Sequence, residues 1–182
     1  MSVRGATLAV ATILVGLSAG FFFTYQASVT LGLAEVGDIA YVEAFQAIND
    51  TIRNPAFAIV FFGSIPAMVA ALVANRHETV GIRMLIGAAL PLYLIGLIVT
   101  VTGNVPLNDE LAGYEIITPS IAADARAGFE DDWNRLNLIR TVAIGGGFAA
   151  LVVAGLIGSY HGAEHASHRA EHGSRAATGH NG

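Results

Sequence analysis

Residues 55–74 read PAFAIVFFGSIPAMVAALVA, a run of twenty positions without a charged side chain. An α-helix of roughly 20 apolar residues is long enough to cross the hydrocarbon core of a bilayer. A helix buried in a soluble protein rarely stays apolar on every side over that length. Three further stretches of similar character lie at 6–33, 82–102 and 138–160. The sequence therefore predicts an all-α fold, an integral membrane four-helix bundle whose transmembrane domain covers residues 1–160.

The composition agrees with a membrane protein. Charged residues make up only 13% of the 182 residues and hydrophobic residues 54%, whereas average globular domains are about 25% charged. The nine cations are all arginines, and the chain has no cysteine. This combination excludes a nucleic-acid-binding protein, a disulfide scaffold and a thiolate metal site. The partner that it predicts is the lipid bilayer.

The arginines indicate how the chain is oriented. With four spans both termini lie on one side, which carries five arginines against four on the other. Because positively charged loops tend to stay in the cytoplasm, we expect a multi-pass protein of the cell membrane with both termini cytoplasmic. Arg4 precedes the first span as in a signal peptide, but the apolar run continues through Tyr25 without a clear cleavage site, so we expect a retained helix. Residues 161–182 then form a His-rich cytoplasmic tail.

Two long segments lie between the spans on the non-cytoplasmic side. In segment 35–54, apolar residues recur at spacings of three and four, as in an amphipathic helix; they are Ile39, Val42, Phe45, Ile48 and Ile52. Segment 103–132 contains two prolines and a cluster of acids, and we expect a long loop with a short helix at 119–132. A loop of this length in a small chain is usually functional or disordered. The amphipathic helix and the long loop are predicted to cap this end of the bundle.

The fourth span begins with the clearest chemical pattern. At about 100° per residue, Trp133, Asn137 and Arg140 fall at about 0°, 40° and −20° on one helix face. An ionisable group near or inside the membrane is by default a functional candidate, so Arg140 and Asn137 are the candidate catalytic residues. The alternative is structural: an interfacial anchor, or an ion pair between Arg140 and Glu35 or Glu43.

Further polar side chains fall at the same end of the bundle. Asn104 and Asn108 bracket Pro106 at the end of the third span, and Gln26 lies in the outer half of the first, next to Tyr25. A mostly apolar pocket with a few directed polar groups is the usual form of a small-molecule site. Gln26, Asn104, Asn108 and Trp133 are therefore the candidate ligand-binding residues, for a small planar aromatic or quinone-like ligand.

Histidine is missing from all four spans, so we expect neither haem nor a di-iron centre within the bundle and no cofactor. The tail is different. His161, His165, His168 and His172 would form one stripe on a helix, and histidine pairs at i and i+4 can bind zinc, nickel or copper. The tail is either such a metal site or an ordinary solvated segment.

The order of these motifs resembles the DUF1772 family of anthrone-oxygenase-like membrane proteins, over about residues 5–160. The resemblance rests on three motifs: FQAIN at 45–49 followed by Pro55, NVPLN at 104–108, and Trp133-Asn134 with Asn137, Arg140 and Thr141. It implies a four-helix membrane protein and, for some members, oxidation of an anthrone by dioxygen without metal or flavin.

In such an enzyme, a base removes a proton from the anthrone and hydrogen-bond donors stabilise the enolate oxygen. By resemblance, the donors are Arg140, Asn137, Asn108 and Asn104, the stacking surface is Trp133, and the base is Glu35, Asp38 or Glu43. The competing interpretation is a non-enzymatic accessory subunit of a larger membrane complex. A transporter is disfavoured, because the four spans show neither an inverted repeat nor an intramembrane acid.

Overall fold

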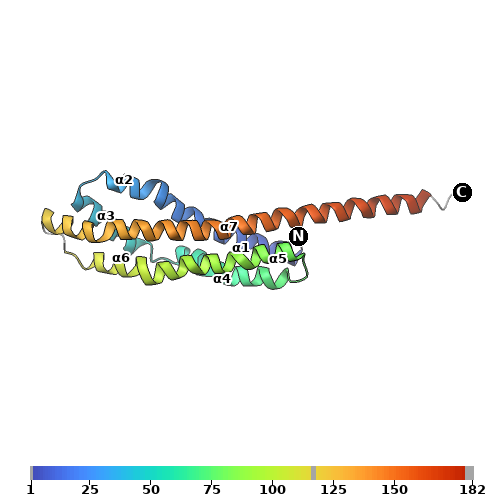
Figure 1. Ribbon diagram of the computed structural model, residues 1–182, viewed down its shortest axis with the longest axis horizontal. Coiled ribbons are helices and arrows are strands. Elements are labelled where there is room, and N and C mark those ends of the chain that lie inside the picture. Colours follow the sequence, from blue (N-terminus) through green and yellow to red (C-terminus); the bar gives the residue numbers. More distant parts are fainter. Residues whose placement is uncertain (1, 116–117, 179–182) are drawn as a thin grey trace.

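The computed structural model describes residues 2–115 and 118–178, with side chains described as far as Tyr160. All of its regular elements are helical (Figure 1): α1 Val3–Thr24, η1 Tyr25–Val29, α2 Thr30–Ala34, α3 Asp38–Thr51, α4 Pro55–Ala74, α5 Val80–Val99, η2 Thr100–Asn104, α6 Val105–Ala112 and α7 Pro119–Thr178. The elements η1 and η2 are single π-helical turns that join their neighbours into continuous rods. The predicted all-α bundle is confirmed.

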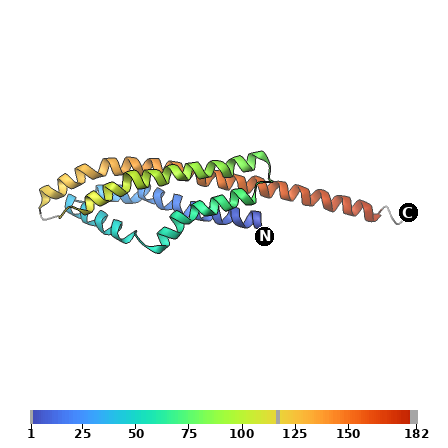
Figure 2. The ribbon, with the colours of Figure 1, turned by 90° about the horizontal axis from the view of Figure 1, so that it is seen from below.

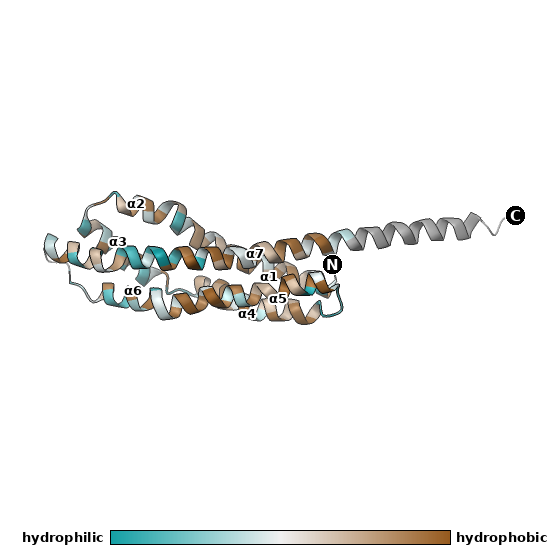
Figure 3. Cartoon of the chain, in the orientation of Figure 1, coloured by the Kyte–Doolittle hydropathy of each residue, from teal (hydrophilic) through white to brown (hydrophobic). Residues whose placement is uncertain are grey.

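The length of helix α4 matches the thickness of a membrane. Its 20 residues extend about 30 Å, the thickness of the hydrocarbon core. The other three candidate spans, Val3–Ala34, Val80–Ala112 and Pro119–Tyr160, are 32 to 42 residues long, so they project beyond the bilayer. They project, with α3 and α6, at the end of the bundle away from the N-terminus, where hydrophilic positions gather (Figure 3). We call α3, α6 and the start of α7 the capped end.

The outward faces of the spans are apolar. At most 28% of the most hydrophobic window of each span is buried within the protein. Large side chains such as Ile13, Ile59, Met84 and Val142 are more than half exposed. Exposed apolar surface of this extent is a liability in water and is covered by lipid tails in a bilayer. The chain is therefore a multi-pass membrane protein.

The segment 103–132 differs from the expected long loop. Helix α5 continues through η2 into α6, α7 begins at Pro119, and only residues 113–118 connect them. The chain stays helical through Pro106 because a π-turn precedes it: the N–H of Val105 bonds to the carbonyl of Thr100, five residues back. This wider turn brings the proline into the first turn of α6, where its missing N–H costs least.

Helices α5 and α7 pack most closely at glycines. A Cβ atom on Gly147 would lie 3.2 Å from the Ala89 carbonyl oxygen, and one on Gly96 would lie 2.6 Å from Ile144 Cγ1. The absence of a side chain at these two positions lets the backbones approach, as in other membrane helix pairs. Gly145, in the same run of three glycines, meets nothing within 4 Å. Within this run, the close backbone approach therefore lies at Gly147.

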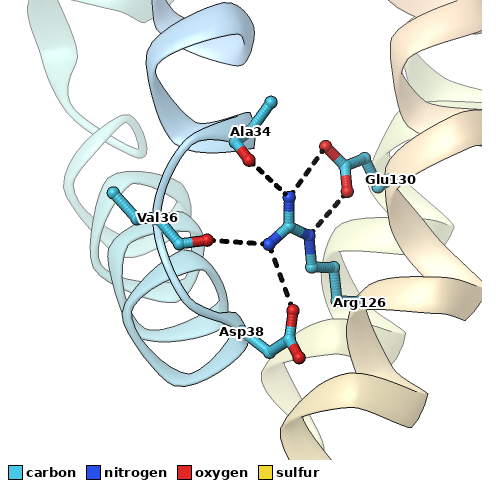
Figure 4. A network of polar contacts seen from close by, with 5 residues as sticks. All are labelled: Ala34, Val36, Asp38, Arg126 and Glu130. Carbon is cyan, nitrogen blue, oxygen red and sulfur yellow. Dashed lines mark hydrogen bonds and ion pairs between the residues drawn. The ribbon is translucent and has the colours of Figure 1, made fainter.

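Arg126 of α7 ties the turn between α2 and α3 to the rest of the capped end (Figure 4). Its guanidinium donates to both Glu130 oxygens, at 2.6 and 3.4 Å, and to Asp38 Oδ1 at 3.1 Å. It also donates to the backbone carbonyls of Ala34 and Val36, at 3.2 and 2.9 Å. Ala34 is the last residue of α2 and Val36 lies in the turn that follows it, where a helix leaves carbonyls without partners within the helix. One partly buried cation thus ties α2, α3 and α7 together.

Tyr41 of α3 packs against this cation, with Arg126 Cζ lying 4.4 Å from the centre of its ring. Burial, and secondarily the Glu130 carboxylate, raise the pKa of Tyr41. The phenol therefore stays neutral and offers the guanidinium a ring face.

Helix α7 runs the full length of the bundle and continues past it to Thr178, as two perpendicular views agree (Figures 1 and 2). The side chains of 161–182, including His161, His165, His168 and His172, lie outside the described residues. Metal binding by this stripe, and the division of the chain at residue 160, therefore stay predictions.

Candidate functional site

A cavity of about 620 Å³ lies where the bundle meets the capped end. Its walls come from the end of α1, the corner between α3 and α4, the η2–α6 rod and α7. The lining is mostly apolar, with aromatic rings on the α1 and α4 sides and polar groups on the η2–α6 and α7 sides. The lining residues used below are Phe22, Tyr25, Asn49, Arg53, Phe57, Phe62, Thr100, Asn104, Val105, Asn108, Asp109, Trp133 and Arg140.

Arg140 supplies a buried cation to the cavity wall. Its residue surface is only 4% exposed, and its Cζ lies 4.1 Å from the centre of the Phe22 ring. Its NH1 donates to Thr100 Oγ1 at 3.3 Å and its NH2 to Asn137 Oδ1 at 2.8 Å. Within the described part of the chain, Arg140 forms an ion pair with no carboxylate. The ion pair with Glu35 or Glu43, one of the two structural alternatives, is therefore wrong.

Asn137 sits behind this cation rather than on the cavity wall. It is fully buried, accepts from Arg140, and donates through Nδ2 to Gln26 Oε1 at 3.3 Å and to the Phe22 carbonyl at 3.5 Å. A chain of amides thus runs from η1 to Arg140. Asn137 and Gln26, predicted as a catalytic and a ligand-binding residue, are placed to orient the guanidinium.

Trp133 forms the part of the wall next to Arg140, with Arg140 Cζ 5.5 Å from its ring. Its indole Nε1 donates to Asn108 Oδ1 at 2.9 Å, which fixes the plane of the ring. Tyr25 and Phe45 pack against it at centroid distances of 5.4 and 5.1 Å. The Trp133 carbonyl accepts from Asn104 Nδ2 at 3.4 Å. The indole is therefore held rigidly against the cavity.

Three lining residues have buried polar atoms without a hydrogen-bond partner among the described residues: Asn49 Nδ2, Asn104 Oδ1 and Arg140 Nε. Buried polar groups are nearly always hydrogen-bonded, so each exception needs an explanation. Residues that line one cavity thus leave two donors and one acceptor without a partner among the described residues.

Both π-turns border this cavity. In η1 the Tyr25 carbonyl accepts from the backbone N–H of Thr30 and, at 3.0 Å, from its hydroxyl. In η2 the same widening lies between Thr100 and Asn104, two lining residues. Single π-turns within α-helices occur often at functional sites, because they turn side chains that a regular helix would point elsewhere.

The carboxylates differ from the sequence prediction. Glu35, Asp38 and Glu43, the expected bases, do not line the cavity, and Asp38 pairs with Arg126. Asp109 does line it and pairs with Arg53 at 2.6 Å. Sequence reasoning missed Asp109 because it ended the third span at residue 102 and treated 103–132 as a loop, whereas Asp109 lies on helix α6.

Other lining residues were also missed, among them Phe22, Thr100 and Asn49. Phe22 and Thr100, the direct partners of Arg140, belong to other helices. Thr100 carries no distinguishing signal in a run of apolar residues and threonines. Asn49 does carry a signal, because it belongs to the FQAIN motif. Gln46 of the same motif holds α6 in place by donating to the carbonyls of Leu111 and Tyr114.

A family model described as anthrone oxygenase matches residues 56–150, just over half of the chain. The matched region runs from α4 into the membrane part of α7 and includes Asn104, Trp133 and Arg140. No curated protein and no solved structure matches the chain.

Proposed function

The chain belongs to the anthrone oxygenase family, and from this membership we propose that it is a membrane-bound, cofactor-independent oxygenase acting on a planar, anthrone-type compound. The observation that carries the proposal is the buried guanidinium of Arg140, which lines the cavity and pairs with no carboxylate among the described residues. A desolvated cation of this kind stabilises an anion far better than one in water. An anthrone that loses its acidic C–H proton becomes such an anion, with its charge on the carbonyl oxygen.

The roles follow from the contacts. Arg140 binds the enolate oxygen, and Asn137 with Gln26 holds the guanidinium in position. Trp133, fixed by Asn108, stacks on the planar ring system, while Asn49 and Asn104 bond to its remaining oxygen substituents. The deprotonated ring carbon reacts with dioxygen, and loss of water leaves a quinone. The reaction as a whole converts one anthrone and one dioxygen into one anthraquinone and one water.

The bilayer is the source of such a substrate in this proposal. Phe62 of α4 and Val105 of α6 both line the cavity, and they are 54% and 37% exposed. Phe62 lies in the second turn of α4 and therefore within the membrane. A flat, apolar compound dissolved in lipid has a short path into the cavity between these two residues.

Binding at this site can be followed through Trp133, the only tryptophan in the chain. We expect saturable quenching of its fluorescence when 9,10-anthraquinone, the unreactive product, is added to the protein in lipid nanodiscs. An aliphatic ketone of similar hydrophobicity is the control and should give no saturable change. If anthraquinone also gives none, the ligand site is absent, and copurification of a stoichiometric partner would then favour an accessory subunit.

We also propose that both termini face the cytoplasm of the cell, because their side carries five arginines against four. The chain has no cysteine, so single introduced cysteines report the topology. Ser2→Cys, at the start of α1, should react with a membrane-impermeant maleimide only after permeabilisation. Tyr114→Cys, at the capped end, should react in intact cells. The reverse pattern would overturn the orientation and leave the site unaffected.

A further inference from the structure

The proposed reaction needs a group that accepts the carbon-bound proton, and none of the side chains given a role so far can do this. Arg140 and Arg53 are cations, the asparagines are neutral amides, and the phenol of Tyr25 is a proton donor near neutral pH. We propose that Asp109 is the general base, and this inference rests on the proposed function. Its neighbour Arg53 orients the carboxylate.

The position of Asp109 carries the inference. Among the described residues that line the cavity, Asp109 is the sole carboxylate. Asp109 follows Asn108 on α6, and Asn108 bonds to Trp133. The part of the cavity lined by Asp109 therefore adjoins the part lined by Trp133 and Arg140 of α7. A planar ligand that lies against Trp133, with one oxygen at Arg140, therefore extends past Asn108 toward Asp109.

The bonding of Asp109 leaves it able to accept a proton. Its Oδ1 accepts from Arg53 NH2 at 2.6 Å, an ion pair that orients the side chain. In the described part of the chain, no hydrogen bond reaches Oδ2. One oxygen is thus held by Arg53, and the other is free for the substrate.

The remaining acids of the capped end lack this combination. Asp38 and Glu130 are both held by Arg126. Asp132 pairs with Arg135 at 3.1 Å, and neither of these residues lines the cavity. The Asp109 and Arg53 side chains are 57% and 64% exposed, so the base lies at the cavity mouth, where protons and water exchange with solvent.

Asp109 alone can carry out all the proton transfers of the proposed reaction. Asp109 first removes a proton from the ring carbon opposite the carbonyl, and the electron pair moves onto the oxygen at Arg140. The carbanion forms a carbon–oxygen bond to dioxygen, the oxidant, and the resulting peroxide takes the proton back from Asp109. Asp109 then removes the second hydrogen of that carbon while the O–O bond breaks. The departing hydroxide recovers this proton as water, and the carbon is left as a carbonyl.

The test combines oxygen uptake during anthrone oxidation with quenching of Trp133 by anthraquinone, both in nanodiscs. Asp109→Asn keeps the size of the side chain and removes the base. Its turnover should fall by about 10²-fold to 10⁴-fold, while the Kd for anthraquinone changes by less than about threefold. Asp109→Glu should recover at least a tenth of the wild-type rate.

Two variants separate catalysis from the ion pair. Arg53→Gln breaks the same pair but keeps the carboxylate, and should lose less than about tenfold. Asp132→Asn breaks a matched exposed Arg–Asp pair outside the cavity, and should leave turnover unchanged.

The outcomes separate this inference from the proposed function. If the wild-type protein oxidises the anthrone and Asp109→Asn stays within threefold of it, the assignment of the base is wrong and the oxygenase function stands. An equal loss in Arg53→Gln, or loss of anthraquinone binding in Asp109→Asn, would also overturn the assignment, since Asp109 would then be a structural tie. A wild-type protein no faster than empty nanodiscs would overturn the proposed function, and the base with it.

Discussion

Replacing Arg140 with Gln is expected to reduce oxygen-dependent turnover of an anthrone by about 10²-fold to 10³-fold, the usual cost of removing one donor to a developing oxyanion. Gln fills much of the same space and can still hydrogen-bond to Asn137, but it carries no charge to stabilise the enolate. Oxygen uptake by the variant in nanodiscs measures the loss. Because anthraquinone is neutral, its Kd from Trp133 quenching should change by less than about tenfold.

The matched control for Arg140→Gln is Arg135→Gln. Arg135 lies five residues earlier on α7, is well exposed, and pairs only with Asp132 among the described residues. The Arg135→Gln variant should keep the wild-type rate of turnover. Turnover by Arg140→Gln within threefold of the wild-type rate would show that the buried guanidinium does not stabilise the reacting anion.

Replacing Arg126 with Ala is expected to lower the free energy of unfolding by about 2 kcal/mol, toward the low end of the range of about 1.5 to 3 kcal/mol for a hydrogen bond to a charged group. The change leaves Glu130, Asp38 and two backbone carbonyls without their common donor. The estimate is at the low end because the Asp38 side chain is 43% exposed and can be rehydrated. Denaturant unfolding in mild detergent, followed by Trp133 fluorescence, measures the change.

Arg135→Ala serves as the control for this stability prediction. It removes one exposed i,i+3 ion pair and should cost less than about 1 kcal/mol. Equal stability losses in the two variants would contradict the role of Arg126 as the tie between the α2–α3 turn and α7.

Local periodicity explains what the sequence predicts correctly. The four spans follow from length and hydropathy, and α4 has the predicted bounds, 55–74. Trp133, Asn137 and Arg140 share a face because helical geometry alone fixes their angles. The amphipathic pattern of 35–54 likewise corresponds to α3, whose buried residues Val42 and Phe45 belong to the predicted stripe.

The partners of these residues depend on contacts between helices, which periodicity does not give. Phe22 lies under Arg140 only because α1 presents that ring to α7. Asp109 reaches the cavity because a π-turn carries α5 through Pro106, where proline normally ends a helix. The sequence therefore predicts the cation and the indole, but not the carboxylate that completes the site.

The most direct test of the whole account is oxygen uptake by the purified wild-type protein in lipid nanodiscs when 9-anthrone is added. The account predicts a rate far above the spontaneous oxidation in empty nanodiscs, with one dioxygen consumed for each anthraquinone formed and no hydrogen peroxide released. A rate equal to that of empty nanodiscs would contradict it.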